Sequence, residues 1–262
     1  MAHTIYSNFI LANKVADLLD TKLSVSPFFT LDTSLTEAEG MTKKIHVYTA
    51  TGDVRDVAQG EGNVTGDDVA VSFTEKEYTV KFTQGRFPYH DEEAMTDSML
   101  VDTGLQKMSA NMVNDLTSKF YTELGKATKT QEYPATGITF DVVVDAIAQF
   151  GEDEDGLFML INPAQKAQLR KNLKDELKYV EGFVRTGYIG SICNVPVYTS
   201  KAVAVDTAFI ATKEAVTVFT KKEVESETER EANPRKNIIY ARRCNVVALT
   251  DANKVVKLTK QA

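Results

Sequence analysis

The sequence predicts an α+β fold in which strands come first, one long helix follows, and a mixed lobe and further strands complete the chain. Apolar residues recur every three or four positions over residues 91–124, which is typical of a long helix. Apolar and polar residues alternate over residues 43–50 and 69–82, which is typical of strands. Short apolar runs bounded by turn residues continue over residues 208–258 and indicate a return to sheet.

Residues 1–40 are expected to form an N-terminal arm. The apolar residues of segment 20–40 recur at no regular spacing, so we expect this segment to be extended. Because the arm carries scattered apolar residues, we expect it to pack on another subunit or back on its own. A short helix is expected over residues 8–19, whose apolar side chains share one helical stripe: Ile10, Leu11, Val15, Leu18 and Leu19.

Residues 41–78 are predicted to form an extended hairpin loop. Two or three strands are expected, and residues 51–66 between them are dense in glycine and charge. An isolated two-stranded ribbon is marginally stable in water, so a hairpin of this length is expected to lean on a partner. The alternating apolar positions after the loop are Val69, Val71, Phe73, Tyr78, Val80 and Phe82.

Residues 79–130 contain the predicted spine helix, which covers residues 91–125. Asp91, Glu92 and Glu93 place negative charge at its N-terminus, and Gly125 stands where a helix-ending glycine is common. One continuous helix of this length would span roughly 50 Å. The apolar stripe is expected to be core, with a partner or cofactor site as the alternative. It consists of Met95, Met99, Leu105, Met108, Met112, Leu116, Phe120 and Leu124.

Residues 131–219 are predicted to form a mixed lobe. Thr139 suits the N-cap of a helix whose apolar face contains Val143, Ile147 and Phe150. Residues 156–162 predict a buried strand. The next helix is expected to begin at Pro163, where the missing N–H of proline costs nothing.

Residues 187–200 are predicted to combine a glycine turn with an apolar strand. Pro196 removes one backbone donor from that strand and therefore favours a sheet edge or a bulge. Nothing in this stretch is catalytically reactive. Cys193, like Cys244, is expected to be a small buried hydrophobic residue, and two cysteines are too few for a disulfide framework or a thiolate zinc site.

Residues 220–262 are expected to return as strands. The predicted strands of the C-terminal half cover residues 208–212, 215–219, 224–230, 237–249 and 254–258, with a turn at 250–253. Glutamates recur at period two and would line one face of a strand, opposite Arg235, Arg242 or Arg243 of another strand or subunit. They are Glu223, Glu225, Glu227 and Glu229.

The composition is that of an ordinary globular protein with a sizeable core. The 262 residues are 43% hydrophobic and 26% charged, and the formal net charge of −7 argues against a dedicated nucleic-acid reader. No window approaches the roughly 18 apolar residues of a membrane-spanning helix, and the N-terminus lacks the pattern of a signal peptide. We therefore expect no membrane contact and synthesis in the cytoplasm.

The sequence offers no recognisable catalytic, cofactor or metal site. His3, His46 and His90 form no metal-ligand spacing with one another or with cysteine. Nucleophile elbows and phosphate-binding glycine loops are absent from the sequence. Residues 152–155 are four consecutive acids, and a metal site there is an alternative to a solvated turn. We expect no catalytic residue, no cofactor and no metal.

Several segments resemble, in the correct order, those of tailed-bacteriophage major capsid proteins with the Hong Kong 97-type fold. Residues 56–62 resemble the glycine-glutamate segment of the extended loop, and residues 78–93 resemble the strand that enters the spine helix. The strand and Asn-Pro of residues 156–163, residues 190–200, 209–216 and 248–258 resemble the later half. The resemblance covers nearly the whole chain.

The resemblance implies a structural protein that is not an enzyme. It implies self-assembly as pentamers and hexamers into an icosahedral virion shell around double-stranded DNA, which is contacted without sequence specificity. Residues 43–78 would reach over a neighbouring subunit, the arm would add contacts, and residues 131–219 would form the axial domain near the capsomer axis. The segments 79–130 and 220–262 would form the peripheral domain.

The resemblance also bears on partners and on rival functions. Because the arm is short, a separate scaffold protein is expected, together with a portal. Some members of the family join subunits through a lysine-asparagine bond, but nothing near Lys43, Lys44 or Lys76 identifies a reactive lysine. Two alternatives remain: an encapsulin-like bacterial nanocompartment shell that packages cargo enzymes, and a small metal-dependent hydrolase.

Overall fold

The computed structural model describes residues 23–37, 39–52, 56, 59–62, 68–97, 99–173 and 190–261. The helix expected over residues 8–19 lies outside the described residues, as do residues 187–189 of the glycine turn. Segment 56–62 is described only in part.

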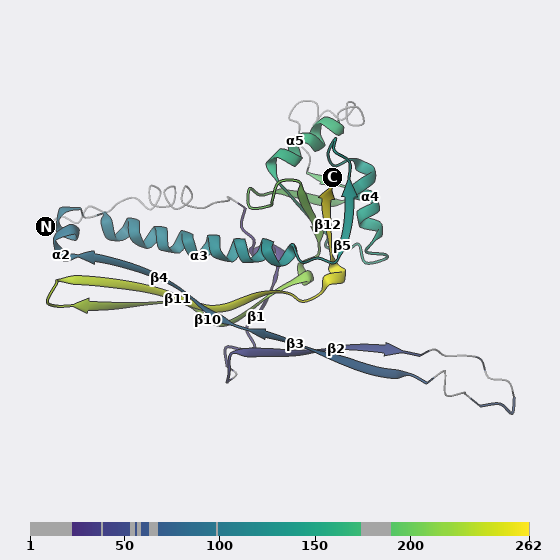
Figure 1. The fold of residues 1–262 in the computed structure, drawn as a ribbon, viewed down its shortest axis with the longest axis horizontal. Coiled ribbons are helices and arrows are strands. Elements are labelled where there is room, and N and C mark those ends of the chain that lie inside the picture. Colours follow the sequence, from purple (N-terminus) through teal and green to yellow (C-terminus); the bar gives the residue numbers. More distant parts are fainter. Residues whose placement is uncertain are drawn as a thin grey trace.

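The described residues form three sheets, the long helix α3 and shorter helices in an elongated arrangement (Figure 1). A four-stranded sheet has the order β1-β10-β11-β4, a six-stranded sheet has the order β5-β12-β9-β6-β8-β7, and β2 and β3 form a separate pair. The first sheet contains β1 (Thr30–Asp32), β4 (Lys81–His90), β10 (Val216–Glu231) and β11 (Lys236–Leu249). The second contains β5 (Lys129–Tyr133), β6 (Phe158–Ile161), β7 (Ser191–Ile192), β8 (Val195–Thr199), β9 (Thr207–Ala211) and β12 (Val255–Lys260). The hairpin strands are β2 (Thr42–Thr51) and β3 (Ala70–Thr79).

The spine helix α3 (Leu100–Leu124) packs along the four-stranded sheet. Its buried Met108 and Met112 contact Ile239 and Ala241 of β11, so this part of the predicted apolar stripe is core. The helix lies so close to β4 that a Cβ at Gly104 would come within 2.3 Å of the Phe87 ring. Glycine at this position therefore permits the close approach of helix and strand.

The prediction of one continuous helix over residues 91–125 is wrong. A short helix, α2 (Asp91–Thr96), ends at Asp97, whose backbone is extended at φ −127° and ψ 104°. The Asp97 carboxylate accepts a hydrogen bond from the Met99 N–H at 2.9 Å, which favours the start of a new helix, α3, directly afterwards. Tertiary contacts fix α2 separately, because Arg230 and Asn237 both donate hydrogen bonds to Asp91.

Two details at the ends of the predicted stripe also differ from expectation. Met95 is 85% exposed on α2, because α2 does not continue the line of the spine helix over the sheet. Gly125 has φ −60°, so it closes α3 in the right-handed region and does not adopt the left-handed conformation of a typical helix-ending glycine.

The six-stranded sheet forms the mixed lobe, with α4 (Phe140–Ala148) and α5 (Pro163–Asn172) packed on its core. The Thr139 hydroxyl accepts a hydrogen bond from the Val142 N–H, which confirms the predicted N-cap. Strand β6 is buried throughout, and α5 begins at Pro163 as predicted. Asn162 caps α5 by accepting a hydrogen bond from the Ala164 N–H at 3.0 Å.

The strand assignment of the C-terminal half needs two corrections. The segments expected at 215–219 and 224–230 are one strand, β10, whose register with β11 shifts between Thr220 and Glu225. Strand β12 pairs with β5 and β9, so residues 255–260 belong to the six-stranded sheet and not to the peripheral return. The second point is decided by pairing of β12 with β5 and β9, which lie far from it in the sequence, and a local pattern does not reveal such pairing.

Strand β8 carries the Val-Pro-Val stretch and lies next to the edge of the six-stranded sheet. Pro196 faces Ser191 of β7, a strand of two residues that forms the edge itself, so the proline lies one strand in from the edge position that its missing N–H predicted. The expectation that Cys193 is buried is wrong, because it is exposed in the turn between β7 and β8. Cys193 and Asn194 have φ of 48° and 64°, as in the tight turns that join two strands.

The described part of the arm packs on its own subunit. Val25, Phe28 and Phe29 are buried against α3 and the six-stranded sheet, and β1 pairs in parallel with the start of β10. Of the two expectations for the arm, folding back on its own chain is confirmed for these residues.

Candidate assembly surfaces

The hairpin of β2 and β3 projects away from the rest of the chain (Figure 1). Its antiparallel register runs without a shift from the pair Thr42 and Thr79 to the pair Thr51 and Ala70. This confirms the predicted extended hairpin, whose strands have ten residues each. Directly opposed residues share one face of such a ribbon, so the register assigns every side chain to one of two faces.

One face of the distal half carries an exposed apolar patch, which we call the hairpin patch: Tyr48, Ala50, Val69, Val71 and Phe73. Tyr48 is 66% exposed and Phe73 is 60% exposed. Their rings lie 6.1 Å apart, and Phe73 also stacks on His46 at 4.7 Å. Large exposed apolar groups that gather on one surface indicate an interaction site.

Charged side chains continue the same face toward the base of the hairpin. Lys44 forms ion pairs with Glu75 at 2.7 Å and with Glu77 at 2.6 Å, and His46 lies 3.3 Å from Glu75. The hydrogen bonds that Lys44 donates to Glu75 and Glu77 raise the pKa of Lys44 above its ordinary value. Hydrogen bonds from Lys44 and His46 lower the pKa of Glu75. The face therefore changes from apolar to charged along its length.

The base of the hairpin is anchored to its own subunit through the opposite face. Tyr78 stacks on Phe219 of β10 at 5.2 Å, and Ile45 packs against the same small core. Lys43 donates a hydrogen bond to the Ser34 hydroxyl at 2.6 Å. Over its described residues, the hairpin is thus held to its own subunit at the base, and the hairpin patch stays exposed.

A second polar surface covers the four-stranded sheet. Arg242 forms an ion pair with Glu227 at 2.9 Å and donates to the Gln84 side chain at 3.0 Å. Tyr240 donates to the Glu229 carboxylate at 2.9 Å. Of the predicted glutamate row, Glu227 therefore pairs with an arginine of β11, and it does so within one subunit. Arg235 instead pairs with Glu92 of α2 at 2.7 Å.

A partly buried ion pair joins the spine helix to this sheet. Arg243, which is 8% exposed, donates to the Asp115 carboxylate at 2.7 Å, and Lys119 donates to the same oxygen at 2.7 Å. Burial raises the pKa of Asp115, but the hydrogen bonds from Lys119 and Arg243 outweigh it, so the pKa lies below its ordinary value. Sequence reasoning placed Arg243 opposite a glutamate and missed this link, whose partners are 128 positions apart.

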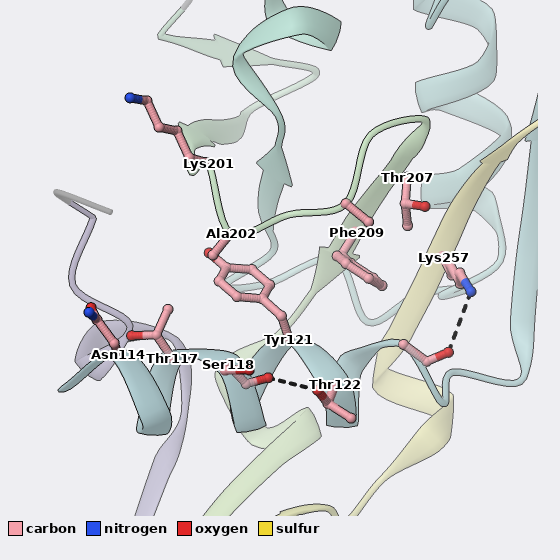
Figure 2. A pocket seen from close by; sticks show the side chains of 12 residues that line it. Asn114, Thr117, Ser118, Tyr121, Thr122, Lys201, Ala202, Thr207, Phe209 and Lys257 are labelled. Atoms are coloured by element: carbon pink, nitrogen blue, oxygen red, sulfur yellow. Dashed lines mark hydrogen bonds between the residues drawn. The ribbon is translucent and has the colours of Figure 1, made fainter. Parts of the chain in front are cut away.

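The pocket in Figure 2 lies between α3 and the loop that follows β8, with a volume of about 430 Å³. Tyr121 and Phe209 line it, and the Lys257 amine donates to the Gly125 carbonyl at 3.5 Å (Figure 2). Lys201 extends away from Tyr121 at the rim. The residues that line the pocket include no histidine, cysteine or carboxylate. The titratable side chains in its lining are Tyr121, Lys201 and Lys257.

The residues with reactive side chains are scattered over the fold. His90 caps α2, and Cys244 is buried, which raises its thiol pKa. Asp153 of the acidic run lies 3.6 Å from the Lys254 amine. Within the described ranges, no three His, Cys, Asp or Glu side chains gather as metal ligands do. None of the described helices is long and apolar enough to cross a membrane.

Comparison with known proteins agrees with this fold. A family profile described as phage capsid protein matches residues 74–258. The major capsid protein of Staphylococcus phage phiMR11 is 24% identical over 258 residues, which are 96% of this chain and 92% of that protein.

Solved structures resemble the chain over most of its length. The mature capsid of bacteriophage PhiM1 aligns with a TM-score of 0.72 and 12% identity, covering 90% of this chain and 86% of that one. A virus-like particle from Pyrococcus furiosus aligns with a TM-score of 0.61 and 12% identity, covering 95% of each chain. Because the family profile covers well over half of the sequence, the chain belongs to the phage capsid protein family, with the Hong Kong 97-type fold that its segments resemble.

Proposed function

We propose that the chain is the major capsid protein of a tailed phage and assembles as pentamers and hexamers into an icosahedral shell around double-stranded DNA. Membership of the phage capsid family supports the proposal. The observation that carries it is the hairpin patch, which is exposed on a ribbon held to its own subunit at the base. A two-stranded ribbon without a core is marginal in water, so its apolar face gains stability by packing on another copy.

The hairpin patch supplies the contact between neighbouring subunits in this proposal. Burial of the exposed parts of Tyr48 and Phe73 would remove on the order of 250 Å² from water, given that an aromatic side chain buries about 200 Å². The charged part of the same face, around Lys44, would fix the register of the contact more than it adds affinity. The six-stranded lobe would lie near the capsomer axis, and the four-stranded sheet with α3 would form the periphery.

Further partners follow from the same function. A separate scaffold protein and a portal would take part in shell formation. Contact with the packaged DNA would be independent of sequence and weakened by salt, because it would depend on phosphate charge. The place of action would be the virion, after synthesis in the host cytoplasm.

The same fold also suits a shell that packages protein cargo in place of DNA. The observation that favours this second function is the structural similarity to a virus-like particle from Pyrococcus furiosus over 95% of each chain. Native particles decide between them: nuclease-protected double-stranded DNA inside supports the capsid, whereas a cargo protein without nucleic acid supports the nanocompartment.

Size-exclusion chromatography followed by electron microscopy of the purified chain tests assembly itself. Six chains of 29.0 kDa give a hexamer of about 174 kDa, and a closed shell elutes in the void volume. We expect one of these species, with co-expression of the scaffold protein where the chain alone stops at the hexamer. A 29.0 kDa monomer at every salt and protein concentration, also beside the scaffold, contradicts the proposal.

A further inference from the structure

The helix α5 carries three cations and no carboxylate on the side that faces away from the core of its lobe. Gln165 and Leu169 are its buried residues. At about 100° per residue, Lys166 lies at the margin of this buried stripe and is half-buried, whereas Arg170 and Lys171 lie outside the stripe and are exposed. The ten residues of α5 include no Asp or Glu. We call the three cations the α5 basic face.

The charge of the α5 basic face is not compensated within the described part of the chain. None of its three cations forms an ion pair with a described carboxylate, whereas other lysines of the same lobe do. Lys254 lies 3.6 Å from Asp153, and Lys260 lies 3.8 Å from Asp206. The face is therefore locally positive in a chain whose formal net charge is −7.

Helix stability explains two of the three cations. Arg170 and Lys171 lie in the last turn of α5, where positive charge interacts favourably with the helix dipole. Lys166 is the fourth residue of α5, near the positive end of the dipole, where the same interaction is unfavourable. Burial and repulsion by Arg170 also lower the pKa of the Lys166 amine. A residue that opposes its local surroundings in this way is typical of a functional site.

The residues around the cations favour a nucleic-acid backbone over an acidic protein. Ala164 and Ala167 are exposed on the same side of α5, and no large apolar or aromatic side chain is exposed on this helix. Protein interfaces are usually anchored by such large side chains. Phosphates, in contrast, are bound mainly by lysine and arginine. Lys166 and Arg170, four residues apart, are neighbours on the helix surface, and a guanidinium can donate two hydrogen bonds to one phosphate.

We propose that the α5 basic face binds the phosphate backbone of the packaged double-stranded DNA, without reading its sequence. The inference rests on the proposed shell around DNA, and it names the surface of the subunit that faces the interior. Up to three phosphate contacts in each subunit correspond to a slope of about −2.7 for log K against log salt concentration. The contact is weak in one subunit and is repeated over the whole shell.

Lysine acetylation in purified particles tests which surface meets the DNA. The modification rate of Lys166 is measured by mass spectrometry in DNA-filled particles and in the same particles after release and digestion of the DNA. We expect Lys166 to react several times more slowly in filled particles, and the exposed Lys213, outside α5, to react equally in both. Equal rates for Lys166 overturn the inference and leave the proposed shell standing. Native particles that contain no DNA contradict the proposed function itself.

Two double variants of the unassembled chain separate the site from overall charge. Lys166→Gln with Arg170→Gln removes two cations of the α5 basic face, and Lys81→Gln with Lys213→Gln removes two exposed lysines elsewhere. Both should keep the wild-type circular dichroism spectrum. Fluorescence anisotropy measures the affinity for a short labelled DNA duplex of random sequence over a range of salt concentrations.

We expect the α5 pair to bind the duplex about tenfold more weakly at low salt, with a slope smaller by about 0.9 for each lost contact. The control pair should bind close to wild type. Equal loss in both pairs, or no duplex binding by the wild-type chain at low salt, overturns the inference. An α5 pair that keeps wild-type affinity for DNA but loses binding to a polyglutamate peptide overturns it in favour of an acidic protein partner.

Discussion

Replacing Phe73 by serine separates assembly from folding. The ring is 60% exposed, and an aromatic side chain buries about 200 Å², so its contact with a neighbour would remove about 120 Å² from water. At about 25 cal/mol per Å² this contributes about 3 kcal/mol to each contact. A loss of about 3 kcal/mol raises the protein concentration needed for half-assembly by about 100-fold.

The assay is a concentration series of Phe73→Ser followed by light scattering and size-exclusion chromatography. Because the side chain is exposed in the single chain, the free energy of unfolding of the unassembled protein should change by no more than about 0.5 kcal/mol. Phe73→Leu, which keeps an apolar side chain, is the matched control and should assemble close to the wild-type concentration. Assembly of Phe73→Ser at the wild-type concentration would refute the role of the hairpin patch.

Three further predictions concern the subunit itself, and urea denaturation measures each of them. Gly104→Ala should destabilise the chain by about 1–3 kcal/mol, because its Cβ would meet the Phe87 ring; an unchanged midpoint would show that the helix can move away. Asp115→Asn should cost about 1 kcal/mol at pH 7. The lowered pKa of Asp115 stabilises the fold at pH values above its ordinary value of 3.8. This stabilisation is lost as the pH falls through the folded pKa, so the stabilities of wild type and variant should approach each other progressively as the pH is lowered below 3.8. If the stability difference between wild type and Asp115→Asn persists at low pH, it comes from packing against Arg243 and not from the charge of Asp115. Asn162→Ala should cost about 1–3 kcal/mol, because it removes both the cap of the Ala164 N–H and the buried hydrogen bond to the Val203 carbonyl; an unchanged midpoint would contradict the capping role.

Local patterns in the sequence were sufficient for the elements whose stabilising contacts are also local. The hairpin follows from alternation, and the start of α5 at Pro163 follows from a proline placed after a capping Asn162. The buried β6 follows from a short apolar run that precedes them. Each of these signals lies within a few residues of the structure that it predicts.

The missed features depend on residues far apart in the sequence. The break between α2 and α3 depends on Asp91, whose partners Arg230 and Asn237 lie about 140 positions away. The sheet that contains β12 is chosen by pairing with β5 and β9, and a strand pattern does not say which neighbour it takes. The position of β4 at the end of its sheet likewise follows only from the sheet order.

The candidate surfaces were predicted unequally for the same reason. The sequence indicated that the hairpin needs a partner, but only the register of β2 and β3 places Tyr48 and Phe73 on one face. Exposure of Cys193 was missed because its apolar neighbours resemble a strand, while the chain turns at Cys193 and Asn194. A turn with positive φ at two residues other than glycine is hard to predict from the sequence, because the glycine that usually marks such a turn is missing.

An electron cryomicroscopy reconstruction of the assembled particle would show directly which surface covers the hairpin patch. We expect pentamers and hexamers in a closed shell, with Tyr48 and Phe73 buried against a neighbouring subunit. A closed shell in which both rings remain exposed to solvent, or contact only their own subunit, would contradict the account.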